Sequence, residues 1–318
     1  MSVDIWPPIS AEELKVKEAE SLKRELAWIT AETIDVCHEL KHGLEDCYAL
    51  LAPIDPGSTL VMSTHRNERV KGTLTRVGTR IVKGTLNLQF RTLPSQVISI
   101  APEAPIHIHA LDELHTHLTQ SLDLLALTIA RPASFDNDAL ALASTLALLA
   151  DSLAEAAALL KGPPLAYPDN SWLASSCPAH HFVPPLPSSV SFHVTLQESN
   201  VVLYLRALEP TDAPQHFGTK LGLAIGTVRR LEHDEMDLIF PYRPRGDGSA
   251  ESRMGSARHS PQPPALGDVE QVFVREKIRI ESADPSLISV YSKLGFLSHM
   301  LDQARRNLAA VMGVELED

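Results

Sequence analysis

The sequence predicts an α+β fold, in which an antiparallel four-helix bundle accompanies a separate, mainly antiparallel β-sheet domain, both discontinuous in sequence. Four stretches carry leucines and other apolar residues at intervals of three and four, which places these residues on one side of a helix. Two other stretches alternate apolar and polar residues, as half-buried strands do. The chain has 318 residues and 44% hydrophobic content, a size that favours two domains.

The first helix is expected over residues 10–52. Ser10 followed by Glu13 is a capping-box sequence, which favours a helix start at this point. Pro53 and the Pro56-Gly57 pair close the region after the helix. The apolar ladder of this helix consists of Leu22, Leu26, Ile29, Thr33, Val36 and Leu40.

Residues 58–100 follow with the alternation typical of strands. The pentapeptide at 70–74, Val-Lys-Gly-Thr-Leu, recurs at 82–86, with Gly78 between the two copies. Two strands joined through a glycine-containing turn form a β-hairpin. Gly72 and Gly84 lie inside these strands, where glycine is costly, so we expect a close approach of neighbouring atoms at both positions.

Two helices are expected next, near 110–130 and 136–161, separated by Arg131-Pro132 and a start signal at Asp136-Asn137-Asp138. Their ladders are Leu111, Leu114, Leu118, Leu122, Leu125 and Ile129 in the first, and Leu142, Leu146, Leu149, Leu153, Ala156 and Leu160 in the second. The proline-rich residues 162–188 have no periodicity and are expected to be a crossing loop.

A second β region is expected over 183–281. Alternation over 190–196, a turn at 198–200 and an apolar run over 201–208 predict a second hairpin. Further strands are expected at 221–231, 236–240 and 269–280. Residues 243–264 contain no aromatic or branched aliphatic side chain, and this composition predicts a disordered insertion.

The last helix, expected over 284–314, has the most regular ladder: Leu287, Val290, Leu294, Leu297, Leu301, Ala304, Leu308 and Val311. Four amphipathic helices can cover each other's apolar stripes within one chain, so a bundle explains the ladders without a partner. We call twelve of these residues the bundle seam. They are Leu22, Leu26, Ile29, Leu118, Leu125, Leu146, Leu149, Leu153, Leu294, Leu297, Leu301 and Leu308.

The predicted domains interleave along the chain. Residues 10–52, 107–161 and 284–314 are assigned to the helical bundle, and residues 58–100 and 183–281 to the β domain. The chain therefore crosses between the two domains several times.

Composition argues against several classes of partner. The 40 acidic and 28 basic residues give a formal charge of −12, which disfavours nucleic acid and an anionic membrane surface. Three cysteines, Cys37, Cys47 and Cys177, are too few and too oddly placed for a disulfide framework and indicate a reduced, intracellular chain. The N-terminus lacks a signal-peptide pattern, and no run is expected to reach the roughly 18 apolar residues of a membrane span.

Histidines provide the only candidates for metal chemistry. His107, His109, His115 and His117 would not converge on one point, because strand and helix geometry separates them. Residues 177–181, Cys-Pro-Ala-His-His, have no second cluster to complete a metal site. We therefore predict no metal, no cofactor and no catalytic residues.

Two other features bear on function. The acidic pair Asp234-Glu235, after His233, is expected to be solvated in a turn between strands. Among the aromatic residues outside the ladders, Trp6 and Trp172 are the first candidates for an interface.

Several segments together resemble the Rogdi family. They are Glu25-Leu26-Ala27-Trp28, the hairpin strand Val70-Lys71-Gly72-Thr73-Leu74, Leu186-Pro187-Ser188-Ser189, Leu205-Arg206-Ala207-Leu208 and the closing leucine helix. The resemblance runs in the same order from about Leu22 to Gly313, and the proline-rich stretch and residues 243–264 are the main departures.

The resemblance implies a non-enzymatic assembly factor, the small subunit of a RAVE-like complex that promotes reassembly of the vacuolar-type proton ATPase. It implies three partners: a large propeller-containing RAVE subunit, an adaptor shared with SCF ubiquitin ligases, and the peripheral sector of the ATPase. The protein would be a monomer within this hetero-complex, cytoplasmic and recruited through partners to vacuolar and endosomal membranes. The alternative is a homodimeric leucine-zipper scaffold unrelated to the pump.

Overall fold

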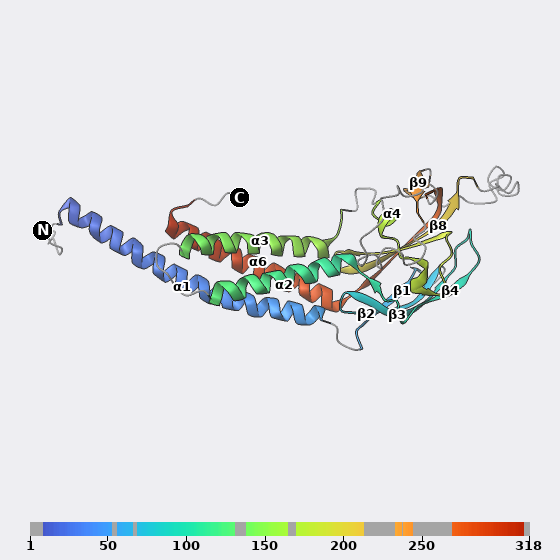
Figure 1. The fold of residues 1–318 in the computed structure, drawn as a ribbon, viewed down its shortest axis with the longest axis horizontal. Coiled ribbons are helices and arrows are strands. Elements are labelled where there is room, and N and C mark those ends of the chain that lie inside the picture. Colours follow the sequence, from blue (N-terminus) through green and yellow to red (C-terminus); the bar gives the residue numbers. More distant parts are fainter. Residues whose placement is uncertain are drawn as a thin grey trace, which may run out of the picture. The chain divides into compact units, whose positions relative to one another are not determined.

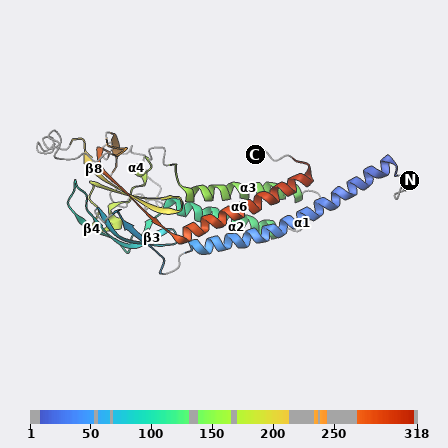
Figure 2. The same cartoon turned by 180° about the vertical axis from the view of Figure 1, so that it is seen from behind.

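The chain divides into two compact units. Unit 1 comprises Met1–Leu50, Glu113–Ala158 and Ser289–Asp318, and unit 2 comprises Leu51–Asp112 and Leu159–Ile288. A computed structural model describes residues 9–52, 56–65, 69–130, 138–164, 170–212, 233–236, 238–243 and 269–314. The fold is α+β, as predicted, with helices and antiparallel sheets (Figures 1 and 2).

The described residues of unit 1 lie almost entirely in four long helices. They are α1 (Ala11–Leu51), α2 (His109–Ala130), α3 (Asp138–Lys161) and α6 (Pro285–Met312). The capping box at the start of α1 is confirmed: the Glu13 backbone N–H donates to Ser10 Oγ at 3.2 Å, and the Ser10 N–H donates to Glu13 Oε2 at 3.3 Å. At the start of α6, Asp284 Oδ1 accepts from the Ser286 N–H at 3.0 Å.

Contacts between side chains identify neighbouring helices. Asp46 of α1 accepts a hydrogen bond from Lys293 of α6 at 2.7 Å, and the Leu297 side chain lies directly against the backbone at Gly43. His117 of α2 lies 3.3 Å from the Ser152 hydroxyl of α3. These contacts join α1 to α6 and α2 to α3 within unit 1.

Ten of the twelve seam residues are buried: Ile29, Leu118, Leu125, Leu146, Leu149, Leu153, Leu294, Leu297, Leu301 and Leu308. Leu26 is half-buried, whereas Leu22 is 57% exposed, so its assignment to the seam was wrong. Leu22 is exposed because α1 is longer than α6. The pairing of Gly43 with Leu297 places Met312, the last residue of α6, opposite about residue 28 of α1, because antiparallel helices rise equally per residue. Nearly all of the preceding residues of α1 are exposed.

The first sheet of unit 2 has the order β1-β2-β3-β4-β6, with β5 paired to β3, and all its pairs are antiparallel. Its strands are β1 (Ser58–Ser63), β2 (Val70–Val77), β3 (Arg80–Leu88), β4 (Gln96–Ile100), β5 (Ile106–His107) and β6 (Phe182–Val183).

The predicted hairpin is β2–β3, and Gly78 adopts a positive φ of 62° in its turn. A Cβ at Gly72 would lie 2.0 Å from the Thr85 carbonyl oxygen, which confirms the close approach expected there.

The second sheet has the order β7-β8-β10-β9 and is also antiparallel. Its strands are β7 (Val190–Gln197), β8 (Asn200–Pro210), β9 (Ile239–Tyr242) and β10 (Glu270–Ala283). Glu198 and Ser199, both with positive φ, form the turn of the predicted second hairpin. The two sheets of unit 2 contact each other through Phe182 of β6 and Phe192 of β7, whose ring centroids are 4.8 Å apart.

The structure differs from the sequence analysis over 162–188. Instead of a plain loop, this stretch contains the helical turn α4 (Trp172–Ser175), a 3₁₀ turn at Ala179–His181 and strand β6. Elements of two to four residues are too short to show a period, so the pattern could not reveal them. The strand expected at 221–231 and residues 244–264 of the expected insertion lie outside the described residues.

Helix α3 also differs from expectation. By length and composition alone, Ala139–Lys161 is long and apolar enough to cross a membrane, with a mean hydropathy of 1.4 over an 18-residue window, although no such run was expected. The cause is composition: alanine and leucine occupy most faces of this helix. Leu142, Leu146, Leu149 and Leu153 of the same helix are buried in the structure, and a core helix of a soluble protein passes the same test.

Candidate functional site

The second sheet of unit 2 has one face rich in polar side chains. Successive residues of a strand point to opposite faces, and the register aligns Arg206 of β8 with Lys277 of β10, and Tyr204 with Arg279. Ser191, His193 and Gln197 of β7 extend this set across the neighbouring strand. Ser191, His193, Gln197 and Arg206 are buried, which is uncommon for these residue types and calls for polar partners.

Arg206 is the centre of this face. Its guanidinium donates two hydrogen bonds to the Glu235 carboxylate, from Nε at 2.7 Å and from Nη2 at 2.8 Å. Both side chains are almost fully buried. Bidentate pairing of this kind is among the stronger charge-assisted interactions in proteins, and it offsets part of the cost of burying the two charges.

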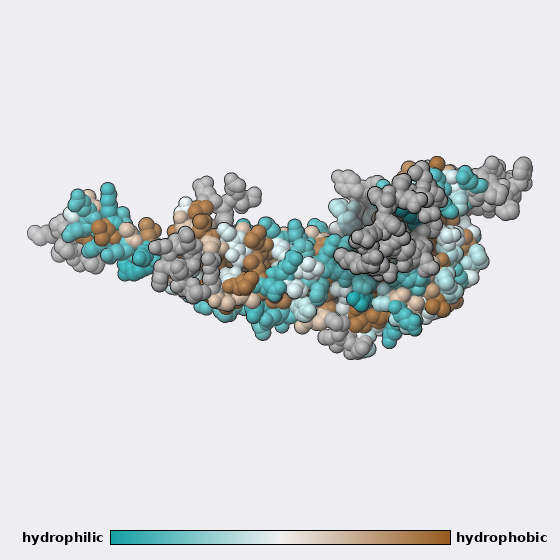
Figure 3. Space-filling view, viewed as in Figure 1, coloured by the Kyte–Doolittle hydropathy of each residue, from teal (hydrophilic) through white to brown (hydrophobic). Residues whose placement is uncertain are grey.

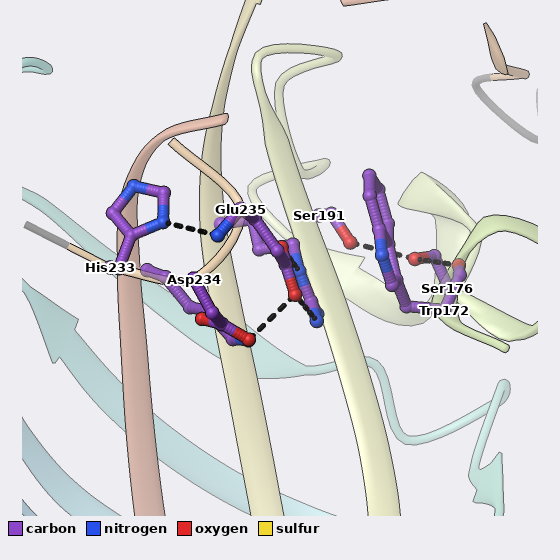
Figure 4. A network of polar contacts seen from close by, with 8 residues as sticks. Trp172, Ser176, Ser191, His233, Asp234 and Glu235 are labelled. Atoms are coloured by element: carbon purple, nitrogen blue, oxygen red, sulfur yellow. Dashed lines mark hydrogen bonds and ion pairs between the residues drawn. The ribbon is translucent and has the colours of Figure 1, made fainter. Parts of the chain in front are cut away.

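Lys277 extends the pair into a four-residue charge network. Its Nζ lies 2.6 Å from Glu235 Oε1 and donates to both carboxylate oxygens of Asp234, at 2.9 and 2.8 Å. The Glu235 backbone N–H donates to His233 Nδ1 at 3.2 Å (Figure 4). The network therefore alternates two positive and two negative side chains and is neutral as a whole.

The Trp172 ring packs against the guanidinium of Arg206. The Arg206 Cζ lies 4.5 Å from the Trp172 ring centroid, a cation–π distance. Trp172 in turn stacks on Tyr242 and meets Phe240 edge-on, with centroids 5.6 and 5.3 Å away. The Ser176 hydroxyl, which bonds the Trp172 carbonyl oxygen at 2.6 Å, holds the turn of α4 in place (Figure 4).

The pKa values of the network follow from burial and charge. Burial raises the pKa of Glu235, but the hydrogen bonds and charges of Arg206 and Lys277 outweigh burial and lower the pKa below its usual 4.5. The pKa of Asp234 is also lowered, since burial is outweighed by the hydrogen bond and charge of Lys277. Burial lowers the pKa of His233 despite the two neighbouring carboxylates. At neutral pH both acids are ionised and His233 is neutral.

A pocket of about 330 Å³ opens over this polar face. Its lining residues are Pro163, Pro164, Thr195, Gln197, Tyr204, Arg206, His233, Asp234, Lys277 and Arg279. Three of these side chains are cationic and one is a carboxylate. Arg206 Nη1 and His233 Nε2 are buried and make no hydrogen bond to the described part of the chain. The arrangement can therefore offer more donors than acceptors to a ligand.

The structure corrects one prediction at this site. Glu235 is 2% exposed, so the expectation that the acidic pair is solvated was wrong for this residue, whereas the Asp234 side chain is 60% exposed. The partners of Glu235 lie on strands 29 or more residues away, and adjacent residues give no signal of them.

The histidines fall into separate local contacts. His107 pairs with Asp112 at 3.1 Å, His115 contacts Tyr48, and His117 contacts Ser152. His181 Nδ1 lies 2.8 Å from the Ala104 carbonyl oxygen. Within the described ranges, no group of three or more His, Cys, Asp or Glu side chains is placed to hold a metal ion.

Exposed apolar side chains occur on the helices of unit 1. Phe296 of α6 is 66% exposed and Trp28 of α1 is 62% exposed. Figure 3 shows hydrophobic side chains, in brown, at the surface of these helices, including the N-terminal part of α1. Trp172 is fully buried and is no surface anchor, and Trp6 lies outside the described residues.

Comparison with known families gives one match. A family model described as Rogdi leucine zipper containing protein matches residues 25–309. A comparison with curated proteins finds no significant match. The matched range includes α1 from residue 25 onward, all of α2 and α3, α6 up to residue 309, and both sheets of unit 2.

Proposed function

Because this chain belongs to the Rogdi leucine zipper family, we propose that it is a non-enzymatic assembly factor, the small subunit of a RAVE-like complex that promotes reassembly of the vacuolar-type proton ATPase. The family match over residues 25–309 carries this proposal. The proposed partners are a large propeller-containing subunit, an SCF-type adaptor subunit and the peripheral sector of the ATPase. The proposed location is the cytoplasm, with recruitment to vacuolar and endosomal membranes through these partners.

The proposal includes the arrangement of the helices. We infer that α1, α2, α3 and α6 form an antiparallel four-helix bundle, in which the leucine ladders pack against each other within one chain. The burial of ten seam residues and the contacts between α1 and α6 and between α2 and α3 support this arrangement. A ladder used inside the chain leaves the outer faces of the helices for partners.

One outer face of α6 is a candidate surface for the large subunit. Ile288 and Tyr291 are exposed and three residues apart, Gly295 follows Tyr291 by four residues, and the exposed Phe296 lies next to Gly295. Glycine inside a helix costs about 1 kcal/mol relative to alanine. No atom lies within 4 Å of the position that a Cβ of Gly295 would occupy, so packing within the chain does not account for this cost. A partner backbone approaching closely at Gly295 would account for it.

Affinity purification of the tagged native protein tests the proposal, with co-purifying chains identified by mass spectrometry under glucose-replete and glucose-starved conditions. We expect a large propeller protein together with peripheral ATPase subunits. Recovery of the protein alone, or only with itself, would overturn the proposal.

A variant pair tests the α6 surface. Phe296→Ala should reduce recovery of the large subunit, and Leu148→Ala, which removes a side chain 61% exposed on α3, should not. Equal recovery with both variants would exclude this face of α6.

The second candidate is a homodimeric leucine-zipper scaffold unrelated to the pump. The exposed Leu22 and Trp28, on the part of α1 beyond the end of α6, favour it because a second copy could cover them. Light scattering distinguishes the two candidates: a purified monomer counts against the scaffold, and a stable dimer supports it.

A further inference from the structure

We propose that the pocket over the polar face of the second sheet binds a small ligand through an oxyanion group, either a carboxylate or a phosphate. The proposal concerns unit 2 alone and does not depend on the assembly function. Its basis is the balance of donors and acceptors around the pocket, together with the size of the pocket.

The acidic side chains at the pocket are already occupied. Both oxygens of Glu235 accept from Arg206, and both oxygens of Asp234 accept from Lys277. A cationic ligand would have to displace Lys277 or Arg206 from these carboxylates. The pocket is therefore poorly suited to a cation.

One buried hydrogen-bond donor at the pocket has no acceptor in the part of the chain that the structure describes. Arg206 is 1% exposed, lines the pocket, and has one guanidinium nitrogen, Nη1, with no hydrogen bond to any described residue. Buried donors without an acceptor are rare in folded proteins and point to an unseen water, ion or ligand. Lys277 and Arg279 also line the pocket, and they already pair with Asp234 and Glu235, and with Glu281, respectively. An oxyanion supplies the acceptor that Arg206 Nη1 lacks among the described residues.

Size and shape limit the ligand. A volume of about 330 Å³ is near the lower end of the range of small-molecule pockets. The Tyr204 ring provides an aromatic surface with Lys277 Nζ 5.6 Å from its centroid, and Pro163 and Pro164 contribute apolar wall. A small organic acid or a phosphorylated metabolite fits these features.

The charge of the whole chain makes the proposal specific. With a formal charge of −12, the protein repels anions on average, so non-specific binding of anions should be weak. Saturable binding of an anion would therefore report a local site.

Isothermal titration calorimetry on the full-length protein tests the proposal. Inorganic phosphate and succinate serve as separate probes, in buffers of constant ionic strength adjusted with sodium chloride. We expect one saturable site for at least one probe, with a dissociation constant in the micromolar to millimolar range. Phosphate binding alone would identify a phosphate site, and succinate binding alone a carboxylate site.

Two matched arginine variants on β10 provide the decisive comparison. Arg279 lines the pocket and pairs with Glu281, whereas Arg275 lies outside the lining and pairs with Glu209. Their side chains are similarly exposed, at 36% and 32%. Arg279→Gln should weaken binding about tenfold, the loss expected for one hydrogen bond to a charged group, and Arg275→Gln should leave it unchanged.

Three outcomes would overturn the proposal: no saturable binding of either probe, an unchanged affinity in Arg279→Gln, or an equal loss in both variants. The last outcome would mean that net charge alone attracts the anion. Circular dichroism of both variants checks that each is folded before the titrations are compared.

Discussion

Two glycines inside helices of unit 1 should respond differently to substitution by alanine. Gly295 of α6 has open space where a Cβ would lie, so Gly295→Ala should stabilise the protein by about 1 kcal/mol through helix propensity alone. A Cβ at Gly43 of α1 would lie 2.4 Å from Leu297 Cδ2 and 3.2 Å from its Cδ1. Overpacking of this kind costs roughly 1–3 kcal/mol, which cancels or exceeds the same gain in propensity.

The difference between the two variants is the quantity to measure. Subtracting the shared gain in helix propensity predicts that Gly295→Ala is more stable than Gly43→Ala by roughly 1–3 kcal/mol. Urea unfolding followed by far-ultraviolet circular dichroism gives this difference, provided that both variants have the same m-value.

Two results would refute the reasoning. A Gly43→Ala variant as stable as Gly295→Ala would mean that Leu297 does not pack on this part of α1. A destabilising Gly295→Ala would mean that the surface around Gly295 is covered in the isolated protein.

Three further predictions concern the charge network and the thiols. Arg206→Met should destabilise the protein by roughly 3–5 kcal/mol, because it leaves Glu235 buried without its main partner. The double variant Arg206→Met, Glu235→Gln should recover part of this free energy of unfolding, which urea unfolding measures for both variants. The lowered pKa of Glu235 means that its ionised form stabilises the fold above pH 4.5, and this contribution is lost as the pH falls through the lower pKa of the folded state. The stability gap between wild type and Glu235→Gln should therefore narrow below pH 4.5, and a gap independent of pH would contradict this account. Burial raises the pKa of Cys37 and Cys47 to about 11 and that of Cys177 to about 12. Ellman's reagent should therefore modify these thiols slowly in the native protein and rapidly in urea. Rapid modification without urea would contradict this prediction.

Local signals in the sequence located the helices well. Helix α1 was expected over 10–52 and spans Ala11–Leu51, and α6 was expected over 284–314 and spans Pro285–Met312. Capping side chains and periodic leucines act within a few residues of the chain, so they can be read without knowledge of the tertiary structure. The glycine-centred hairpin at β2–β3 was predictable for the same reason.

Features that depend on distant partners were not predictable. Trp172 was a candidate surface anchor because it lies outside the leucine ladders, yet Phe240 and Tyr242 from β9 pack against it and it is buried. Glu235 looked solvated because it lies beside Asp234, yet Arg206 of β8 binds it. The pocket residues come from β7, β8, β10 and two connections, and no motif joins them in sequence.

Leu22 illustrates a different limit. Its spacing continues the ladder of α1 without a break, so the pattern alone assigns it to the seam. Whether a stripe is buried depends on how far the neighbouring helices extend, and α6 ends opposite a later part of α1. Periodicity identifies the face of a helix but not the length over which that face is covered.

The order of segments in the two units affects synthesis of the protein. Strand β10, which lies between β8 and β9, and helix α6, which packs on α1, both follow residue 269, far behind the segments that they contact. During translation, neither unit can complete its packing until these residues leave the ribosome, so the part of α1 that packs on α6 remains uncovered until then. A premature stop before residue 270 would therefore leave both units incomplete, and we expect such a product to depend on chaperones or be degraded.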